Sequence, residues 1–138
     1  MAHHGRVCIA LWTKKPTLEL FEVQRSELAL ATLRRPGQQL FVCVIAAKAD
    51  APDQDVRDAT SAMVTALGSK LAACACVIEG TGFRAAITRT VLTGMLLVVR
   101  TPMPFTFVDS APQACSWLGS YMRKDELHGL SEALQKLG

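Results

Sequence analysis

Long apolar runs, aromatic residues and concentrated charge are all scarce in this chain of 138 residues. Its most apolar long stretch, Ala85–Val99, carries an arginine and is shorter than the roughly 20 residues that cross a bilayer as a helix, so we expect no membrane span. Aromatic residues make up only 6% of the sequence, so aliphatic side chains must build the core. Basic residues form no cluster larger than an adjacent pair such as Arg34 and Arg35, which argues against a nucleic-acid-binding module.

Catalytic motifs are missing as well. The sequence has no Gly-x-Ser-x-Gly turn for a nucleophilic serine, and its one Gly-x-Gly turn lacks the lysine of a phosphate-binding loop. His3 and His4 lie near a terminus that we expect to fray, and His128 lies on the last helical segment, where a surface position is expected. We therefore expect no enzyme and assign no catalytic residue.

Five cysteines cannot all pair, and their positions suit free thiols. Four of them lie in apolar, strand-like runs and the fifth in a helical segment: Cys8, Cys43, Cys74, Cys76 and Cys115. A zinc site needs about four ligands, and no second cysteine pair or histidine stands near Cys74 and Cys76 in the sequence. Buried free cysteines are typical of a reducing compartment, and no secretory signal is visible, so we expect a cytoplasmic protein.

Segments that suit buried strands alternate with segments of helical periodicity. Strands are expected at about 6–12, 39–46, 74–78 and 105–108, and helices at about 17–35, 53–71, 82–98, 110–122 and from 125 onward. Such alternation predicts parallel pairing through right-handed crossovers, with helices on both faces of the sheet. We expect an α/β fold: a single-domain sandwich with a mostly parallel sheet of about four strands in residues 1–122, followed by a C-terminal amphipathic helix in residues 123–138.

The stretch Ala73–Arg89 is the place where fold signal and possible chemistry coincide. An apolar run stops at a Gly-x-Gly turn and a helical pattern starts at once, as at the ligand-binding edge of α/β sheets. Free N–H groups at that helix start, together with two arginines, would suit a phosphate or a carboxylate. The simpler alternative is a tight turn that needs glycine, with its phenylalanine in the core and its arginines solvated or paired. The candidate ligand-binding residues are Gly80, Thr81, Gly82, Phe83, Arg84 and Arg89.

An acidic cluster precedes and opens the second expected helix: Asp50, Asp53, Asp55 and Asp58. Oxygen-rich Mg²⁺ sites have this composition. Acidic residues at a helix start also cap free N–H groups and complement the helix dipole, which explains their placement without a metal. We therefore assign no metal and no cofactor, and an enzyme that uses Mg²⁺ here is the least expected function.

Four leucines at helical spacing line one narrow seam of the last helix: Leu127, Leu130, Leu134 and Leu137. Such a seam either docks on its own domain or forms an interface with a partner or a second copy. One short helix does not decide between the two, and both alternatives stay open. From this stripe and the apolar third helix we expect a homodimer.

Three local patterns accompany this order of elements: Gly-x-Gly-Phe at Gly80–Phe83, Pro-x-Pro at 102–104 and a helix reading Ala-Cys-Ser-Trp-Leu at Ala114–Leu118. Over Val7–Leu118 the chain thereby resembles the SpoIIAA-like branch of the STAS domains. The resemblance implies a bacterial cytoplasmic module without catalysis, used for regulatory protein contacts or for binding a small ligand. The phospho-acceptor serine of anti-anti-sigma STAS domains would fall at Lys48–Asp53, where no serine or threonine stands.

Two functions therefore remain from the sequence. The first is a non-enzymatic regulatory or protein-interaction module of STAS-like type, with an unknown protein partner. The second is a protein that binds a small anionic or lipid-like ligand at the Gly80–Arg84 turn. The broad architecture that STAS domains share with lipid-carrying Sec14-type domains implies that an apolar pocket is possible in this fold.

Overall fold

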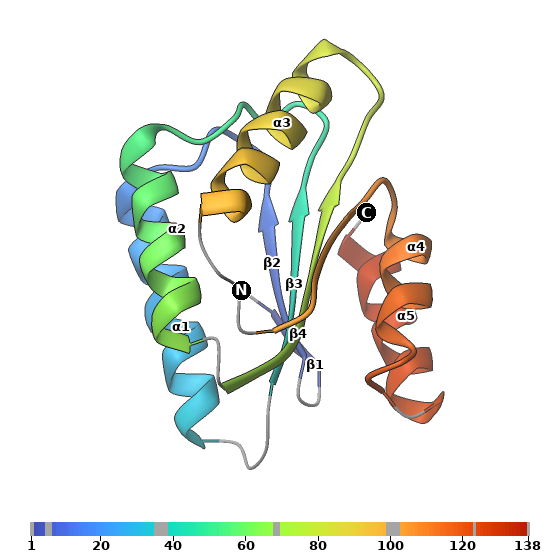
Figure 1. Ribbon diagram of the computed structural model, residues 1–138. Helices are drawn as coiled ribbons and strands as arrows, with labels where there is room; N and C mark the ends of the chain where they lie inside the picture. Colours follow the sequence, from blue (N-terminus) through green and yellow to red (C-terminus); the bar gives the residue numbers. More distant parts are fainter. Residues whose placement is uncertain are drawn as a thin grey trace.

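The structure is a computed structural model that describes residues 2–4, 7–34, 39–67, 70–98, 103–122 and 124–137. In this part of the chain, helices cover both faces of a five-stranded sheet (Figure 1). Its elements are, in order, β1 (Ala2–His4), β2 (Val7–Trp12), α1 (Leu18–Arg34), β3 (Gln39–Ile45), α2 (Gln54–Leu67), β4 (Leu71–Ile78), α3 (Phe83–Val98), β5 (Phe105–Val108), α4 (Ala111–Leu118) and α5 (Lys124–Leu137).

The strands lie side by side in the order in which they occur in the sequence. Strands β2 to β5 are parallel, and β1 pairs with β2 in the antiparallel direction. Right-handed crossovers that always step the same way place every connecting helix on one face. Helices α1, α2 and α3 accordingly lie together on one side, while α4 and α5 cover the other (Figure 1). The expected α/β sandwich with four parallel strands is confirmed.

Two strands, β1 and β4, differ from the expectation. His3 and His4, expected on a frayed terminus, pair with Cys8 and Val7 in the short strand β1. Three residues are too few to show an alternating pattern, so the sequence gives no signal for this strand. Strand β4 begins at Leu71, earlier than expected.

A β-bulge near the start of β4 explains why the sequence pattern does not reveal the first residues of this strand. Gln39 lies opposite Leu71 and Leu40 opposite Ala73, so Ala72 is an extra residue in β4. The bulge interrupts the alternation of side chains that identifies a strand in the sequence.

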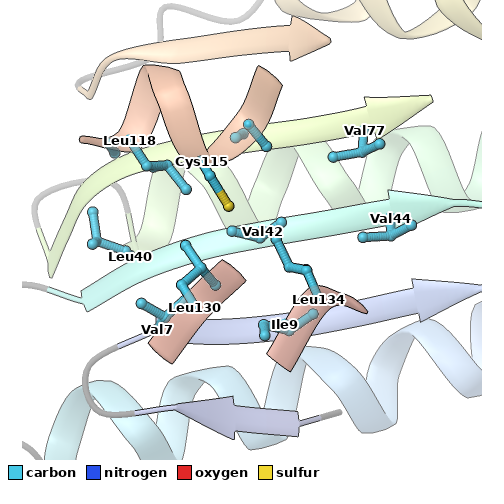
Figure 2. Packing of buried hydrophobic residues seen from close by; sticks show 13 residues of the cluster. Val7, Ile9, Leu40, Val42, Val44, Val77, Cys115, Leu118, Leu130 and Leu134 are labelled. Carbon is cyan, nitrogen blue, oxygen red and sulfur yellow. The ribbon is translucent and has the colours of Figure 1, made fainter. Parts of the chain in front are cut away.

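The face covered by α4 and α5 is sealed. Val7 and Ile9 of β2 and Val42 of β3 alternate with residues that point to the opposite face, and all three are buried. Leu130 and Leu134 of α5 pack against them (Figure 2). The C-terminal segment is therefore part of the same hydrophobic core as the strands.

Helix α4 also has a clear local origin. The hydroxyl oxygen of Ser110 accepts a hydrogen bond from the N–H of Gln113 at 3.4 Å, and Pro112 stands in the first turn. An N-cap serine satisfies one of the otherwise free N–H groups of a helix start, and proline there has no N–H to satisfy. The helix turns Ala114, Cys115 and Leu118 into the sealed core.

Candidate functional site

The sheet face under α1, α2 and α3 is sealed less completely than the other face. On the central strand β3, Val42 and Val44 point to the α4–α5 side and are buried, whereas Cys43 points to the α1–α3 side and is only half-buried. Phe105 and Phe107 of β5 are half-buried as well, and their rings stack on each other in a tilted arrangement with centroids 5.3 Å apart. The helical layer therefore leaves space over this face.

That space is a cavity of about 90 Å³ between the sheet and the helices. Its wall is mostly aliphatic, aromatic and sulfur-containing, and polar side chains enter it at Gln24, Asp50 and Thr60. The hydroxyl of Thr60 already donates to the carbonyl of Val56 at 2.7 Å. The other lining residues are Trp12, Pro16, Phe21, Leu28, Phe41, Cys43, Ile45, Pro52, Val56, Met63, Val64, Leu71, Cys74, Cys76, Leu92, Met95, Met103, Phe105 and Phe107.

Three thiols face the cavity from neighbouring strands: Cys43 of β3, and Cys74 and Cys76 of β4. The spacing of two residues predicts that Cys74 and Cys76 share a face. Burial raises the pKa of the Cys74 thiol well above its usual range. The pKa of the Cys76 thiol is also raised well above its usual range, chiefly by a hydrogen bond with Cys43 and secondly by burial. Thiols held in the neutral form are poor nucleophiles and behave as small apolar groups. Cys74 and Cys76 thus act as apolar parts of the cavity wall.

Two ion pairs hold the loop at one end of the cavity, where Asp50 and Pro52 contribute to the wall. Arg84 at the start of α3 pairs with the carboxylate of Asp50 at 3.2 Å and also donates to the carbonyl of Lys48 at 2.7 Å. Lys15 pairs with Asp53 at 2.8 Å, and this hydrogen bond and charge raise the pKa of Lys15. These contacts tie the loop between β3 and α2 to two other segments.

The turn from Gly80 to Arg84 serves first as a structural joint. Gly80 has a φ of +94°, and a Cβ atom there would lie 2.9 Å from the Cβ of Ala47. Phe83 is 83% exposed, so the alternative that placed it in the core is wrong. Helix α3 begins at Phe83 itself, and its first turn points this side chain away from the sheet.

The two arginines of the proposed anion site bind different segments of the chain. Arg84 binds the loop that carries Asp50, whereas Arg89 forms a hydrogen-bonded ion pair with Asp109, just before α4. Both guanidinium groups thus already have a carboxylate from the chain itself. An anionic ligand at this turn would compete with Asp50 and Asp109 for these guanidinium groups.

The leucine seam of α5 packs on its own domain. Leu130 and Leu134 are buried in the core with the strands, and Leu127 packs against that core. The side chain of Leu137 lies outside the described residues. Leu130 and Leu134 are therefore not available to a second chain. For these two residues, the alternative in which the seam packs on its own domain is the correct one.

The acidic cluster forms no metal centre in the structure. Asp50 and Asp53 pair with basic residues, and Asp58 accepts a hydrogen bond from the side chain of Gln54 at 2.7 Å. Within the described ranges, no group of three or more histidine, cysteine or acidic side chains has the geometry to bind a metal ion. His128 is exposed on α5 beside Glu132.

No family model, curated protein or solved structure matches this chain. In the part of the chain that the structure describes, none of the helices combines the length and the apolarity needed to cross a bilayer. The cavity and the exposed surfaces are therefore the features of the molecule that bear on its function.

Sequence reasoning identified the side chains of the cavity only in part. Alternation along β3 and β4 predicts that Cys43, Cys74 and Cys76 each share a face with other core residues. What it could not predict is that this face is the incompletely covered one, because coverage depends on how closely three helices approach the sheet.

Proposed function

We propose that this protein binds a small apolar molecule, or the apolar end of a lipid-like molecule, between its sheet and the α1–α3 layer. The observation that carries the proposal is Cys43, half-buried at the centre of the sheet over a cavity of about 90 Å³, while both its neighbours in β3 are buried. Ligand sites are typically apolar hollows with a few polar groups to orient the ligand. Gln24 and Asp50 are such groups here.

The size of the cavity supports this reading. An engineered apolar cavity of about 150 Å³ binds benzene, so the smaller space here suits a short alkyl chain. Met63, Met95 and Met103 in the wall have flexible side chains that can adjust to a larger guest.

The lipid-like form of the ligand is favoured over the purely anionic form. Arg84 and Arg89, the cations of the Gly80–Arg84 turn and its helix, are both engaged by carboxylates. An apolar ligand, in contrast, displaces nothing from the chain when it enters the cavity. The turn contributes by holding the loop that carries Asp50.

The test titrates the protein with 1-hexanol and with toluene while following its melting temperature and ligand-observed NMR. Cys43→Leu fills the cavity, so it should raise stability by about 1 kcal/mol and weaken probe binding by at least about tenfold. Cys43→Ala should lower stability and retain binding. This opposite movement of stability and affinity distinguishes a filled cavity from a damaged fold.

Val42→Ala provides the matched control, because Val42 is the next residue in β3 and points to the sealed face. It should cost stability and leave probe binding unchanged. Absence of any bound probe, or equal binding by the parent and Cys43→Leu, would reject the proposed function.

A second candidate is a regulatory interaction module, as the resemblance to STAS domains implies. Phe83 favours it: this phenylalanine stands exposed at the start of α3, one turn before the exposed Ile87. Without a serine or threonine at Lys48–Asp53, such contacts would not be switched by phosphorylation at that position. A pull-down with the parent and with Phe83→Ser as bait tests it, and a stoichiometric partner should be recovered by the parent alone.

We place this activity in a bacterial cytoplasm. None of the five cysteines forms a disulfide bond in the structure, which suits a reducing compartment. Formation of disulfides in the protein isolated under non-reducing conditions from its native cells would argue against this location.

A further inference from the structure

Helix α1 is apolar on two opposite faces. Its inner face buries Phe21 and Leu28 in the core. Five of the seven large apolar side chains that stand exposed in the described residues lie on this one helix, between 44% and 71% exposed: Leu18, Leu20, Val23, Leu30 and Leu33. A helix that is apolar on both faces is normally covered on both, and exposed apolar patches mark interaction surfaces.

We propose that the outward face of α1 packs against the same face of a second copy, with the two helices antiparallel. Glu19 lies in the first turn of α1 and Arg34 in its last turn. Antiparallel packing brings Glu19 of each copy to the level of Arg34 of the other, so both ends of the helix pair gain an attraction between opposite charges. Parallel packing would instead bring like charges together.

The apolar side chains have the same symmetry as the charges. Glu19 and Arg34, Leu20 and Leu33, and Val23 and Leu30 are three pairs equally distant from one midpoint, between Ser26 and Glu27. An antiparallel pair of helices with its two-fold axis at that midpoint therefore sets each apolar turn against an apolar turn. A two-fold interface requires such a self-complementary surface.

The charges on α1 do not suit a lipid surface. Helices that lie on membranes carry lysine and arginine beside their apolar face. Here Glu19, Glu22 and Glu27 outnumber Arg25 and Arg34, and Arg25 pairs with Glu22 at 2.7 Å. The helix therefore has no excess of positive charge to attract an anionic bilayer, whereas a second copy offers it both an apolar surface and opposite charge.

This self-association does not depend on the proposed ligand. The outward side chains of α1 are on the far side of the helix from Phe21 and Leu28, which line the cavity. Failure of one proposal therefore leaves the other standing. The two are measured separately, by oligomeric state and by probe binding.

The test is sedimentation velocity of the full chain over a range of micromolar concentrations. The parent should show a concentration-dependent dimer, and Val23→Gln with Leu30→Gln should weaken association by at least about tenfold without lowering the melting temperature of the monomer. Ile87→Gln is the matched control: Ile87 is 41% exposed and Leu30 45% exposed, but Ile87 lies on α3. It should leave association unchanged.

A charge exchange tests the antiparallel arrangement. Glu19→Arg and Arg34→Glu should each weaken the dimer, and the double variant should restore it, because the swapped charges again face opposite signs. A parent that stays monomeric at every concentration, or a dimer that survives the Val23→Gln and Leu30→Gln changes, overturns the proposal. So does a double variant as weak as the single ones, or a monomer whose α1 face binds phosphatidylglycerol vesicles instead.

Discussion

Cys43 and Cys76 lie directly opposite each other on the neighbouring parallel strands β3 and β4, and both side chains line the cavity. Cys74 stands two residues earlier on β4 and faces the same way. Sulfur therefore occupies the centre of the open face of the sheet, where bulkier aliphatic side chains would have filled the space. Small, neutral thiols keep this wall both apolar and hollow.

These thiols predict a loss of stability in alkaline solution. Burial holds the pKa of Cys74 above the ordinary thiol value of 9.0 in the folded protein, and the hydrogen bond with Cys43 together with burial does so for the pKa of Cys76. The unfolded chain therefore releases these protons first. The stabilisation is complete below that value and falls as pH rises beyond it, by up to about 1.4 kcal/mol per pH unit for each thiol. Urea unfolding between about pH 8 and about pH 10 measures the slope. The double variant Cys74→Ala and Cys76→Ala should have a shallower slope, and identical slopes would contradict the prediction.

Gly80 should tolerate substitution poorly, in contrast to Gly82. Alanine at position 80 would have to adopt a φ near +94° and place its Cβ 2.9 Å from that of Ala47, so we expect Gly80→Ala to cost about 1–3 kcal/mol. Gly82 has nothing within 4 Å of an added Cβ, and Gly82→Ala should change the free energy of unfolding by less than about 0.5 kcal/mol. Chemical denaturation of both variants checks the pair. Equal costs at the two positions would show that the backbone at Gly80 imposes no constraint.

The packing of α5 predicts a large effect of truncating its central leucine. Leu130 is fully buried among the strands and α4, so Leu130→Ala should destabilise the protein by about 2–5 kcal/mol. Phe83→Ala removes a larger side chain from an exposed position and should cost less than about 0.5 kcal/mol. Thermal and urea unfolding compare the two. A mild effect at Leu130 would indicate that α5 separates easily from the sheet.

Arg84 should contribute little to stability through its ion pair. Its side chain is more than half exposed, and exposed pairs contribute up to about 1 kcal/mol, less in salt. A double-mutant cycle of Arg84→Gln and Asp50→Asn measures the coupling between the two side chains. The coupling should shrink as sodium chloride is added, and a large coupling that resists salt would mean that this pair is sheltered from solvent.

The amino-acid pattern was informative where one residue's neighbours in sequence are also its neighbours in space. The continuous apolar run in β3 and the expected bounds of β5 at 105–108 came directly from it, and so did the common face of Cys74 and Cys76. Local pattern failed at β1, which pairs only because β2 offers a free edge. It failed again at Phe83, since a helix start says nothing about the direction in which its first side chain points.

The α/β class, the parallel strands and the alternation that divides each strand between two cores follow from backbone geometry and the period of apolar residues, so they could be predicted from the amino-acid pattern. Which face is sealed depends instead on how the helices pack on the sheet. Leu130 and Leu134, which were candidates for an interface, are buried in the core, whereas the outward leucines of α1 are exposed. Tertiary packing also left Cys43 over a cavity. Whether a residue is buried under a helix or left beside a cavity depends on the distance between the helix layer and the sheet. Many side chains from different parts of the chain set that distance together, so no short stretch of sequence predicts it.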